Sequence, residues 1–184
     1  PLQRKLLAQV IDHIDDLNKR ISNLDKLVQN YMDEYEAAIA ALCEIPGIAR
    51  RSAEVILAEI GLDMSRFPSA AHLCSWAGVC PGNYQSAGRR KHGKTTKGNK
   101  ALKTILTQCA KSARSVKQSY FSAQYQRIAA RRGKNRATLA VAHSMLIAIY
   151  HMLKNSMPFR DLGADYYDSR SEERRVGKEC LEWW

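Results

Sequence analysis

The chain has 184 residues, and its 29 Lys and Arg against 18 Asp and Glu give a formal net charge of +11. No apolar run approaches the ~18 residues that a membrane span needs, and no secretory signal opens the sequence. The five cysteines form no CxxC pair and the histidines no i, i+4 pair, which argues against a structural zinc site and a disulfide framework. We therefore expect reduced thiols in a cytoplasmic protein that does not bind membranes.

The positive charge is concentrated in one region. Residues 64–160 carry 18 Lys or Arg and no Asp or Glu, whereas residues 1–63 carry 7 basic and 11 acidic side chains and residues 161–184 carry 4 and 7. A surface with only positive charge repels itself and is tolerated mainly where a polyanion neutralises it. Nucleic acid is the obvious polyanion. The alternative is a soluble basic domain that binds no polyanion, and the concentration of the charge in one region disfavours it.

Residues 1–41 are predicted to form a long coiled-coil helix, the first part of an all-α fold. Apolar residues recur at alternating spacings of three and four, with no Pro or Gly between them, as in a heptad seam. We expect a homo-oligomer through this seam, or pairing with a helix of a preceding segment, since the chain does not begin with Met. An amphipathic helix that packs on its own domain is the alternative. The seam consists of Leu7, Val10, Ile14, Leu17, Ile21, Leu24, Val28, Tyr31, Tyr35 and Ala38.

Residues 42–61 are predicted to form a helix, a tight turn at Pro46-Gly47 and a second helix that ends at Gly61. The pattern resembles a helix-hairpin-helix, in which backbone N–H groups of a Gly-rich hairpin point at a DNA phosphate. Gly47 is therefore a candidate phosphate-binding residue. Ala49 stands where the motif usually has its second Gly, and a plain helical corner is the alternative.

A short helix is predicted around Ala70–Ala77, with Leu73 and Trp76 facing the core, and Gly78 ends it. Residues 81–98 are predicted to be a loop, because four Gly and five Lys or Arg surround a single serine, Ser86. Several cations follow Ser86 closely and could hold a phosphate: Arg89, Arg90, Lys91, Lys94 and Lys97. His92 is assigned a supporting role, and a role as general acid or base is the alternative.

Three more helices are predicted in the basic region. Asn99 caps the first, which packs a face running from Leu102 to Val116 and turns Lys100 and Lys103 toward phosphate. The second runs from about Ser119 to Arg132, so Arg131 and Arg132 at its end are further candidate contacts. The third, about Arg136 to Lys154, is almost wholly apolar and is predicted to be the buried central helix, with His143 and His151 as core or helix-face residues.

Residues 169–184 are set apart from the predicted domain at 42–168. From Arg170 onward the sequence has no apolar period and resembles a translated sequencing-adaptor oligonucleotide. We expect a disordered read-through scar, and a natural disordered tail is the alternative.

Eight short motifs follow one another along residues 42–168, and together they resemble the C-terminal transposase domain of the insertion sequence 110/116/902 family. The motifs are Ile45-Pro46-Gly47-Ile48, Trp76-Ala77-Gly78-Val79-Cys80-Pro81-Gly82-Asn83, Ser86 with Gly88, Thr96-Lys97-Gly98-Asn99-Lys100-Ala101-Leu102-Lys103, Ala123-Gln124-Tyr125, Ala129-Ala130-Arg131-Arg132-Gly133, Val141-Ala142-His143-Ser144 and Asp161-Leu162-Gly163-Ala164-Asp165-Tyr166-Tyr167.

The resemblance implies a bacterial, nucleoid-associated recombinase that moves an insertion sequence, with DNA and an element-encoded guide RNA as partners. It implies an N-terminal RNase H-like domain, outside this chain, whose acidic residues bind Mg²⁺. It also implies that a serine of the C-terminal domain attacks a DNA phosphodiester and becomes joined to it. The matching serine is Ser86, although this chain has Ser86-Ala87-Gly88 where some members have Ser-Gly.

The acid-free stretch fits this division of labour, because residues 64–160 cannot supply a carboxylate metal site. We expect no metal in this chain, and a fragment that binds nucleic acid without recombining it. Three alternatives remain open: a passive phosphate clamp at Ser86, a non-catalytic nucleic-acid-binding module, and a metal-dependent nuclease built on this chain alone.

Overall fold

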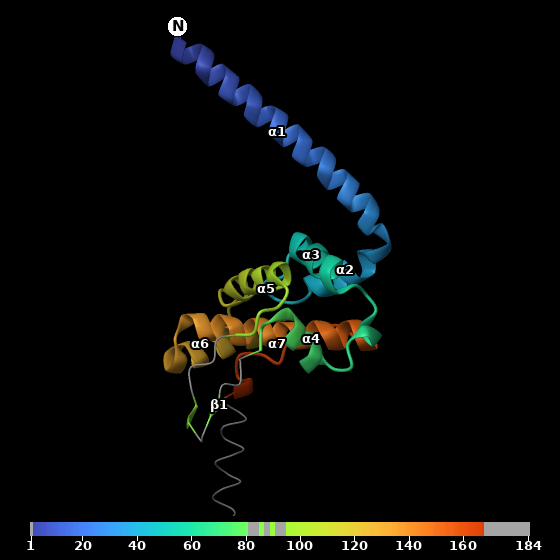
Figure 1. Cartoon of the computed structure of the whole chain (residues 1–184), viewed down its shortest axis with the longest axis vertical. Helices are drawn as coiled ribbons and strands as arrows, with labels where there is room; N and C mark the ends of the chain where they lie inside the picture. The colour runs from blue at the N-terminus through green and yellow to red at the C-terminus, as the bar shows by residue number, and fades with distance from the viewer. Residues whose placement is uncertain (1, 81–84, 87–88, 91–94, 168–184) are drawn as a thin grey trace, which may run out of the picture. The chain divides into compact units, whose positions relative to one another are not determined.

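The structure is a computed structural model that describes residues 2–80, 85–86, 89–90 and 95–167 (Figure 1). Within these residues the secondary structure is helical apart from two strands of two residues each, so the predicted all-α class is confirmed. The chain divides into two compact units, Pro1–Ala37 and Ala38–Trp184.

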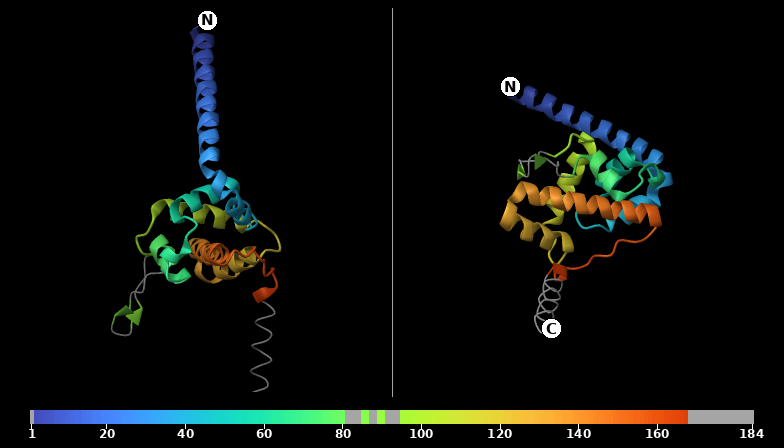
Figure 2. Two further views of the ribbon diagram at one scale, coloured as in Figure 1. Left: turned by 90° about the vertical axis from the view of Figure 1, so that its right-hand side faces the viewer. Right: turned by 60° about the horizontal axis from the view of Figure 1, so that its bottom comes forward.

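The N-terminal unit is dominated by α1, Leu2–Met32, and the long helix predicted there is confirmed (Figure 2). None of its residues is buried. The helix ends earlier than the sequence pattern suggests, because the 3₁₀ turn η1, Asp33–Tyr35, separates it from α2, Glu36–Cys43. Asp33 and Glu36 are like charges three residues apart, which disfavours a continuous helix, and acidic residues stabilise the beginning of a new one.

The second unit is built around α7, Lys134–Asn155, on which α4, α5 and α6 pack. Val141, Met145, Leu146 and Ile149 on α7 are fully buried, so the predicted central helix is confirmed. Among the described residues, α7 is also the one helix long and apolar enough to cross a membrane, and half of that apolar window is buried. Its contacts with three neighbouring helices account for its apolar composition.

The predicted helix–turn–helix is confirmed: α2 ends at Cys43 and α3 covers Arg50–Ile60, with Gly61 as its C-cap. The helix α4, Ala70–Ala77, likewise has the predicted bounds. The prediction for Trp76 is wrong, because this side chain is 42% exposed whereas Leu73 is buried. Leu73, Cys74 and Ala77 form the buried arc of α4, and at 100° per residue Trp76 falls outside that arc. Trp76 instead contacts the ring of Phe67.

The helix α5, Lys100–Ala113, is capped by Asn99 as predicted. It stops before Val116, which is 41% exposed, so the prediction that Val116 lies on the packed face is wrong. Consecutive tight turns, in which the Ser115 and Val116 N–H groups donate to Ser112 and Ala113, end the helix there. The helix α6, Tyr120–Arg132, begins after Ser119 and ends at Gly133, as predicted.

Candidate nucleic-acid interface

Ser86 lies in a small antiparallel ladder formed by β1, Gln85–Ser86, and β2, Arg89–Arg90. The prediction of a loop without regular structure over residues 81–98 is therefore wrong at these four positions. The register makes Ser86 the backbone partner of Arg89, and Gln85 the partner of Arg90. Ala87-Gly88, between the two strands, is not one of the dipeptides that signal a two-residue hairpin, so the sequence pattern did not indicate this ladder.

The side chains of Ser86, Arg89 and Arg90 lie outside the described part of the structure, as do Lys91 and Lys94 altogether. Their roles as nucleophile and phosphate-holding cations stay predictions.

The described residues on either side of this segment meet at a close backbone crossing, which we call the loop base: Gly78, Gly98 and Asn99. A Cβ atom on Gly78 would lie 2.8 Å from the Gly98 nitrogen, and one on Gly98 would overlap the Gly78 nitrogen. Only glycine allows two backbones to approach this closely. The Asn99 N–H also donates to the Trp76 carbonyl at 3.2 Å. The two ends of the Ser86 segment are thus held together.

An acidic residue from outside the basic region reaches the loop base. Glu59 on α3 accepts a hydrogen bond from Asn99 Nδ2 at 2.6 Å, while Asn99 Oδ1 accepts from the Leu102 N–H at 2.9 Å and so caps α5. Glu59 therefore helps to orient the residue that begins α5. The sequence analysis missed it, because Glu59 and Asn99 are 40 positions apart and no local pattern connects them.

The three predicted lysine contacts next to the loop base differ in their surroundings. Lys97 and Lys100 are exposed, and neither side chain bonds to a described residue. Lys103 is half-buried, and its Nζ donates to Thr95 Oγ1 at 2.7 Å. Lys97 and Lys100 can therefore meet a phosphate directly, whereas Lys103 also holds the end of the loop.

Burial makes the thiols next to this segment poor nucleophiles. Desolvation raises the pKa of Cys74 to about 12 and also raises the pKa of Cys80. Because the thiolate is the reactive form of cysteine, both side chains stay protonated near neutral pH. Across the described residues, no three His, Cys, Asp or Glu side chains come together as metal ligands would.

A second group of cations lies where α6 passes into α7. We call it the corner cluster, and all of its members are exposed: Arg127, Arg131, Arg132, Lys134 and Arg136. An open hollow of about 720 Å³ is lined by residues 132–136 at the beginning of α7, where no side chain caps the helix. Backbone N–H groups and positive charge at a helix N-terminus suit an anion. The sequence analysis proposed Arg131 and Arg132 but missed the other three members.

Gly47, the candidate phosphate contact of the hairpin, packs closely against α5. Its φ is +91°, and a Cβ atom there would lie 2.6 Å from the Cys109 carbonyl oxygen and the Ala113 nitrogen. This packing by itself accounts for glycine at position 47, and a phosphate contact through its N–H stays a prediction.

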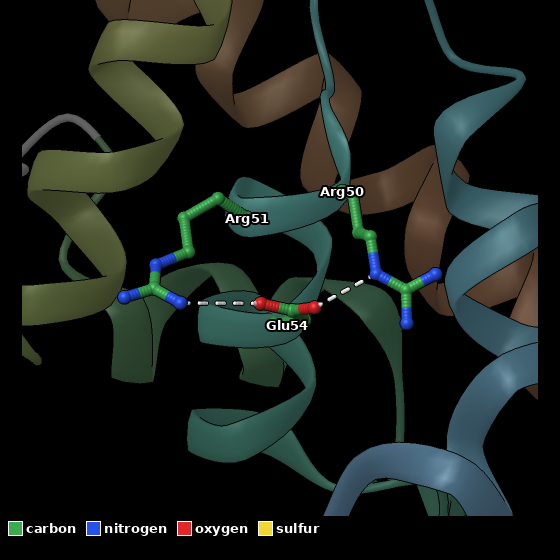
Figure 3. A network of polar contacts seen from close by, with 3 residues as sticks. All are labelled: Arg50, Arg51 and Glu54. Atoms are coloured by element: carbon green, nitrogen blue, oxygen red, sulfur yellow. Dashed lines mark hydrogen bonds and ion pairs between the residues drawn. The ribbon is translucent and has the colours of Figure 1, made fainter. Parts of the chain in front are cut away.

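The beginning of α3, next to this hairpin, carries two arginines around one carboxylate (Figure 3). Arg50 Nε lies 3.1 Å from Glu54 Oε1, and Arg51 Nη1 lies 3.7 Å from Glu54 Oε2. Glu54 is nearly buried and the arginines are more open. The pairing holds both guanidinium groups near the hairpin.

Residues 39–126 match the family model described as Transposase IS116/IS110/IS902 family, a span that includes the loop base and Ser86. These residues therefore form a transposase domain of this family.

Three curated proteins are similar to it. An uncharacterised 43.6 kDa protein of insertion element IS110 from Streptomyces coelicolor is 31% identical over 136 residues, which are 70% of this chain and 30% of the relative. The pilin gene-inverting proteins of Moraxella bovis and Moraxella lacunata are each 28% identical over 155 residues, which are 80% of this chain and 48% of the relative. The chain thus spans less than half the length of the curated relatives it matches.

Proposed function

We propose that the chain is the DNA-binding and catalytic-serine part of an insertion-sequence transposase. The observation that carries the proposal is the family match over residues 39–126, which covers the Ser86 segment and the loop base. The acid-free basic region supports it, because 18 Lys and Arg without a carboxylate between residues 64 and 160 suit a polyanion.

In the proposed reaction, Ser86 Oγ forms a bond to a DNA phosphorus and one strand's P–O bond breaks. The leaving strand end takes a proton and becomes a hydroxyl group, while the other end stays joined to the serine. Attack by a hydroxyl of a second strand reverses the step and releases Ser86, so no external energy source is needed. Arg89, Arg90, Lys91 and Lys94 would offset the charge that develops on the phosphoryl oxygens.

The remaining parts of the reaction are assigned to protein outside this chain. Glu59 is the described acid at the loop base, and it is engaged with Asn99, so we derive no metal-dependent step here. Acidic residues that bind Mg²⁺, and recognition of the target through a guide RNA, would belong to the full-length protein in the cytoplasm. The isolated chain is then expected to bind nucleic acid without recombining it.

The N-terminal unit would join two copies of the chain. The helix α1 buries none of its residues although large apolar side chains recur along it. Their heptad spacing is that of a helix that packs against a like helix, so we assign α1 to homo-oligomer formation.

The decisive experiment replaces the nucleophile. In a full-length protein that contains this chain, Ser86→Ala should abolish strand exchange and the covalent protein–DNA product seen on a denaturing gel, while DNA binding stays nearly unchanged. Ser75→Ala, at an exposed position on α4, is the matched control and should keep full exchange. Equal exchange by Ser86→Ala and wild type would overturn the assignment.

A second candidate is a nucleic-acid-binding module without catalysis. The corner cluster favours it, because these exposed cations and the adjoining hollow do not depend on Ser86. Tight binding by the full-length protein with no covalent intermediate under any exchange condition would favour this reading.

A further inference from the structure

A smaller hollow lies beside α6, and an unsatisfied polar side chain lines it. The hollow has a volume of about 220 Å³ and is lined by Gln124, Arg127, Ile128, Arg131, Arg132 and Tyr167. Gln124 is 9% exposed, its Nε2 donates to Ser144 Oγ at 2.8 Å, and its Oε1 has no hydrogen-bond partner among the described residues. If the amide were turned round, its NH₂ group would be the one left without a partner. Buried polar atoms are nearly always paired. Because Oε1 has almost no accessible surface, a ligand in the hollow reaches it only when the amide turns toward the hollow.

We propose that this hollow, the Gln124 hollow, receives the base of one unpaired nucleotide. The inference rests on the proposed function, because the nucleotide belongs to the DNA or RNA that the chain binds. The volume limits the ligand, since pockets for drug-sized molecules measure roughly 300–1,000 Å³. A single base is a compact ligand of the right order, and its amino or ring N–H groups supply the donor that Gln124 Oε1 lacks.

Planar and apolar groups in the lining suit a base. The Arg127 guanidinium lies over the Tyr167 ring, with its central carbon 5.3 Å from the ring centroid, and one of its nitrogens donates to the Tyr167 carbonyl at 3.3 Å. Tyr167 in turn stacks on Tyr120. Bases of single-stranded nucleic acids commonly stack on aromatic rings and on guanidinium planes. Ile128 adds apolar surface to the same lining.

The phosphate of the same nucleotide has a place next to the base. Arg132 lines both the Gln124 hollow and the larger hollow at the beginning of α7. Arg131, Arg132 and Lys134 are exposed, and their side chains bond to no other described residue. A base bound near Gln124 would therefore direct its phosphate toward these cations and the uncapped N–H groups of α7.

The nucleotide must be unpaired, because a base inside a duplex is stacked on both faces and cannot present its pairing edge to a buried amide. A bulged, flipped or single-stranded position can do so. The proposed contacts involve the base and the phosphate alone, so the hollow would accept either sugar.

The test compares two hairpin oligonucleotides that differ at one position. One has a single bulged adenine and the other an abasic residue there, so that the phosphates are identical. We expect the 184-residue chain to bind the adenine hairpin about tenfold more tightly than the abasic hairpin at 100 mM salt, a difference typical of one stacked base. Fluorescence anisotropy measures both affinities. DNA and RNA versions of both hairpins show which nucleic acid supplies the base.

Gln124→Met should reduce this preference to near unity while binding of the abasic hairpin is unchanged. Gln126→Met, at an exposed position on the same helix, is the matched control and should keep the preference. The Tm of Gln124→Met should change little, because the substitution removes a buried unpaired acceptor together with the hydrogen bond to Ser144. Should the variant fail to fold, the wild-type ratio of the two affinities still decides the question.

Equal affinity of the wild type for both hairpins would overturn the proposal and leave Gln124 with no more than a bound water. In that case the nucleic-acid-binding function survives, since both hairpins bind. Absence of binding to either hairpin would instead overturn the proposed function, and the base site with it.

Discussion

The side chain of His143 makes the stability of the fold depend on pH. It is half-buried on α7, and burial lowers its pKa below the ordinary value because the charged imidazolium is poorly solvated there. The unfolded chain therefore takes up the proton more readily than the native one. The stability that neutral His143 contributes is present above about pH 6.5 and is lost as the pH falls from there toward the native pKa.

We therefore expect His143→Gln to flatten the fall in Tm between pH 7 and pH 5. Thermal unfolding followed by circular dichroism at half-unit steps measures it. His151→Gln, at an exposed histidine on the same helix, controls for the substitution itself. The same slope in wild type and His143→Gln would contradict the assignment.

The cysteines should differ in reactivity according to their burial. Cys74 and Cys109 are buried, and desolvation raises the pKa of both thiols, that of Cys74 to about 12. Cys43 is exposed at the end of α2. At pH 8 iodoacetamide should modify Cys43 in the native chain and reach Cys74 and Cys109 only in denaturant, because the thiolate is the reactive species. Peptide mass mapping reads out each site, and rapid native labelling of Cys74 would show that α4 opens more easily than its packing implies.

At the scale of elements, the loop base should depend on the absence of a side chain at position 98. Gly98→Ala would place a methyl group against the backbone of Gly78 and Ala77, and such crowding costs roughly 1–3 kcal/mol. We expect a Tm lower by several degrees and, in a full-length protein, a loss of strand exchange beyond what the lower stability explains, because the crossing holds both ends of the Ser86 segment.

Gly163→Ala gives the matched control for this variant. No atom lies within 4 Å of a Cβ there, yet its φ of +79° strains any other residue, at about 1–2 kcal/mol. It should lower the Tm and leave exchange intact. Exchange that survives in Gly98→Ala would show that the Ser86 segment does not need the close crossing.

Local signals in the sequence were sufficient to predict most helices of the second unit. Asn99 as a cap and Gly61 and Gly78 as helix ends act within one turn of the chain. The predictions failed where tertiary contacts determine whether a side chain is buried. Trp76 is apolar but lies off the buried arc of α4, and whether a large side chain is covered depends on neighbours distant in sequence.

The candidate site shows the same limit. Residue types and motif order were enough to propose Ser86 and the cations that follow it, because a basic, Gly-rich loop is a local composition. The link from Glu59 to Asn99 and the unsatisfied amide of Gln124 were not visible, since each depends on contacts between elements. A periodic pattern in the sequence does not show which buried side chain lacks a hydrogen-bond partner.

At the scale of the whole molecule, the concentration of positive charge in residues 64–160 should govern the binding of nucleic acid. Neutralising one cation that contacts a phosphate reduces the slope of log K against log salt by about 0.9 for duplex DNA. Arg131→Gln, at an exposed position of the corner cluster, should produce a change of this size. Arg20→Gln on α1, where the arginine pairs with Asp16 at 2.9 Å, should leave the slope unchanged. Equal slopes for Arg131→Gln and the wild type would show that the corner cluster does not contact the phosphate backbone of DNA.

The two compact units should also be separable. The buried apolar residues begin at Ile39, and α1 contributes none of them, so removal of residues 1–37 should leave the Tm of the second unit within a few degrees of its value in the whole chain. The same deletion should convert the expected oligomer into a monomer by analytical ultracentrifugation. Leu17→Asp in the whole chain places a charge in the heptad seam and should dissociate it likewise, whereas Asn18→Asp adds the same charge at an exposed position outside the seam and should not. An oligomer that survives both the deletion and Leu17→Asp would place the contact between copies in the second unit, and the exposed seam of α1 would then need a partner other than its own copy.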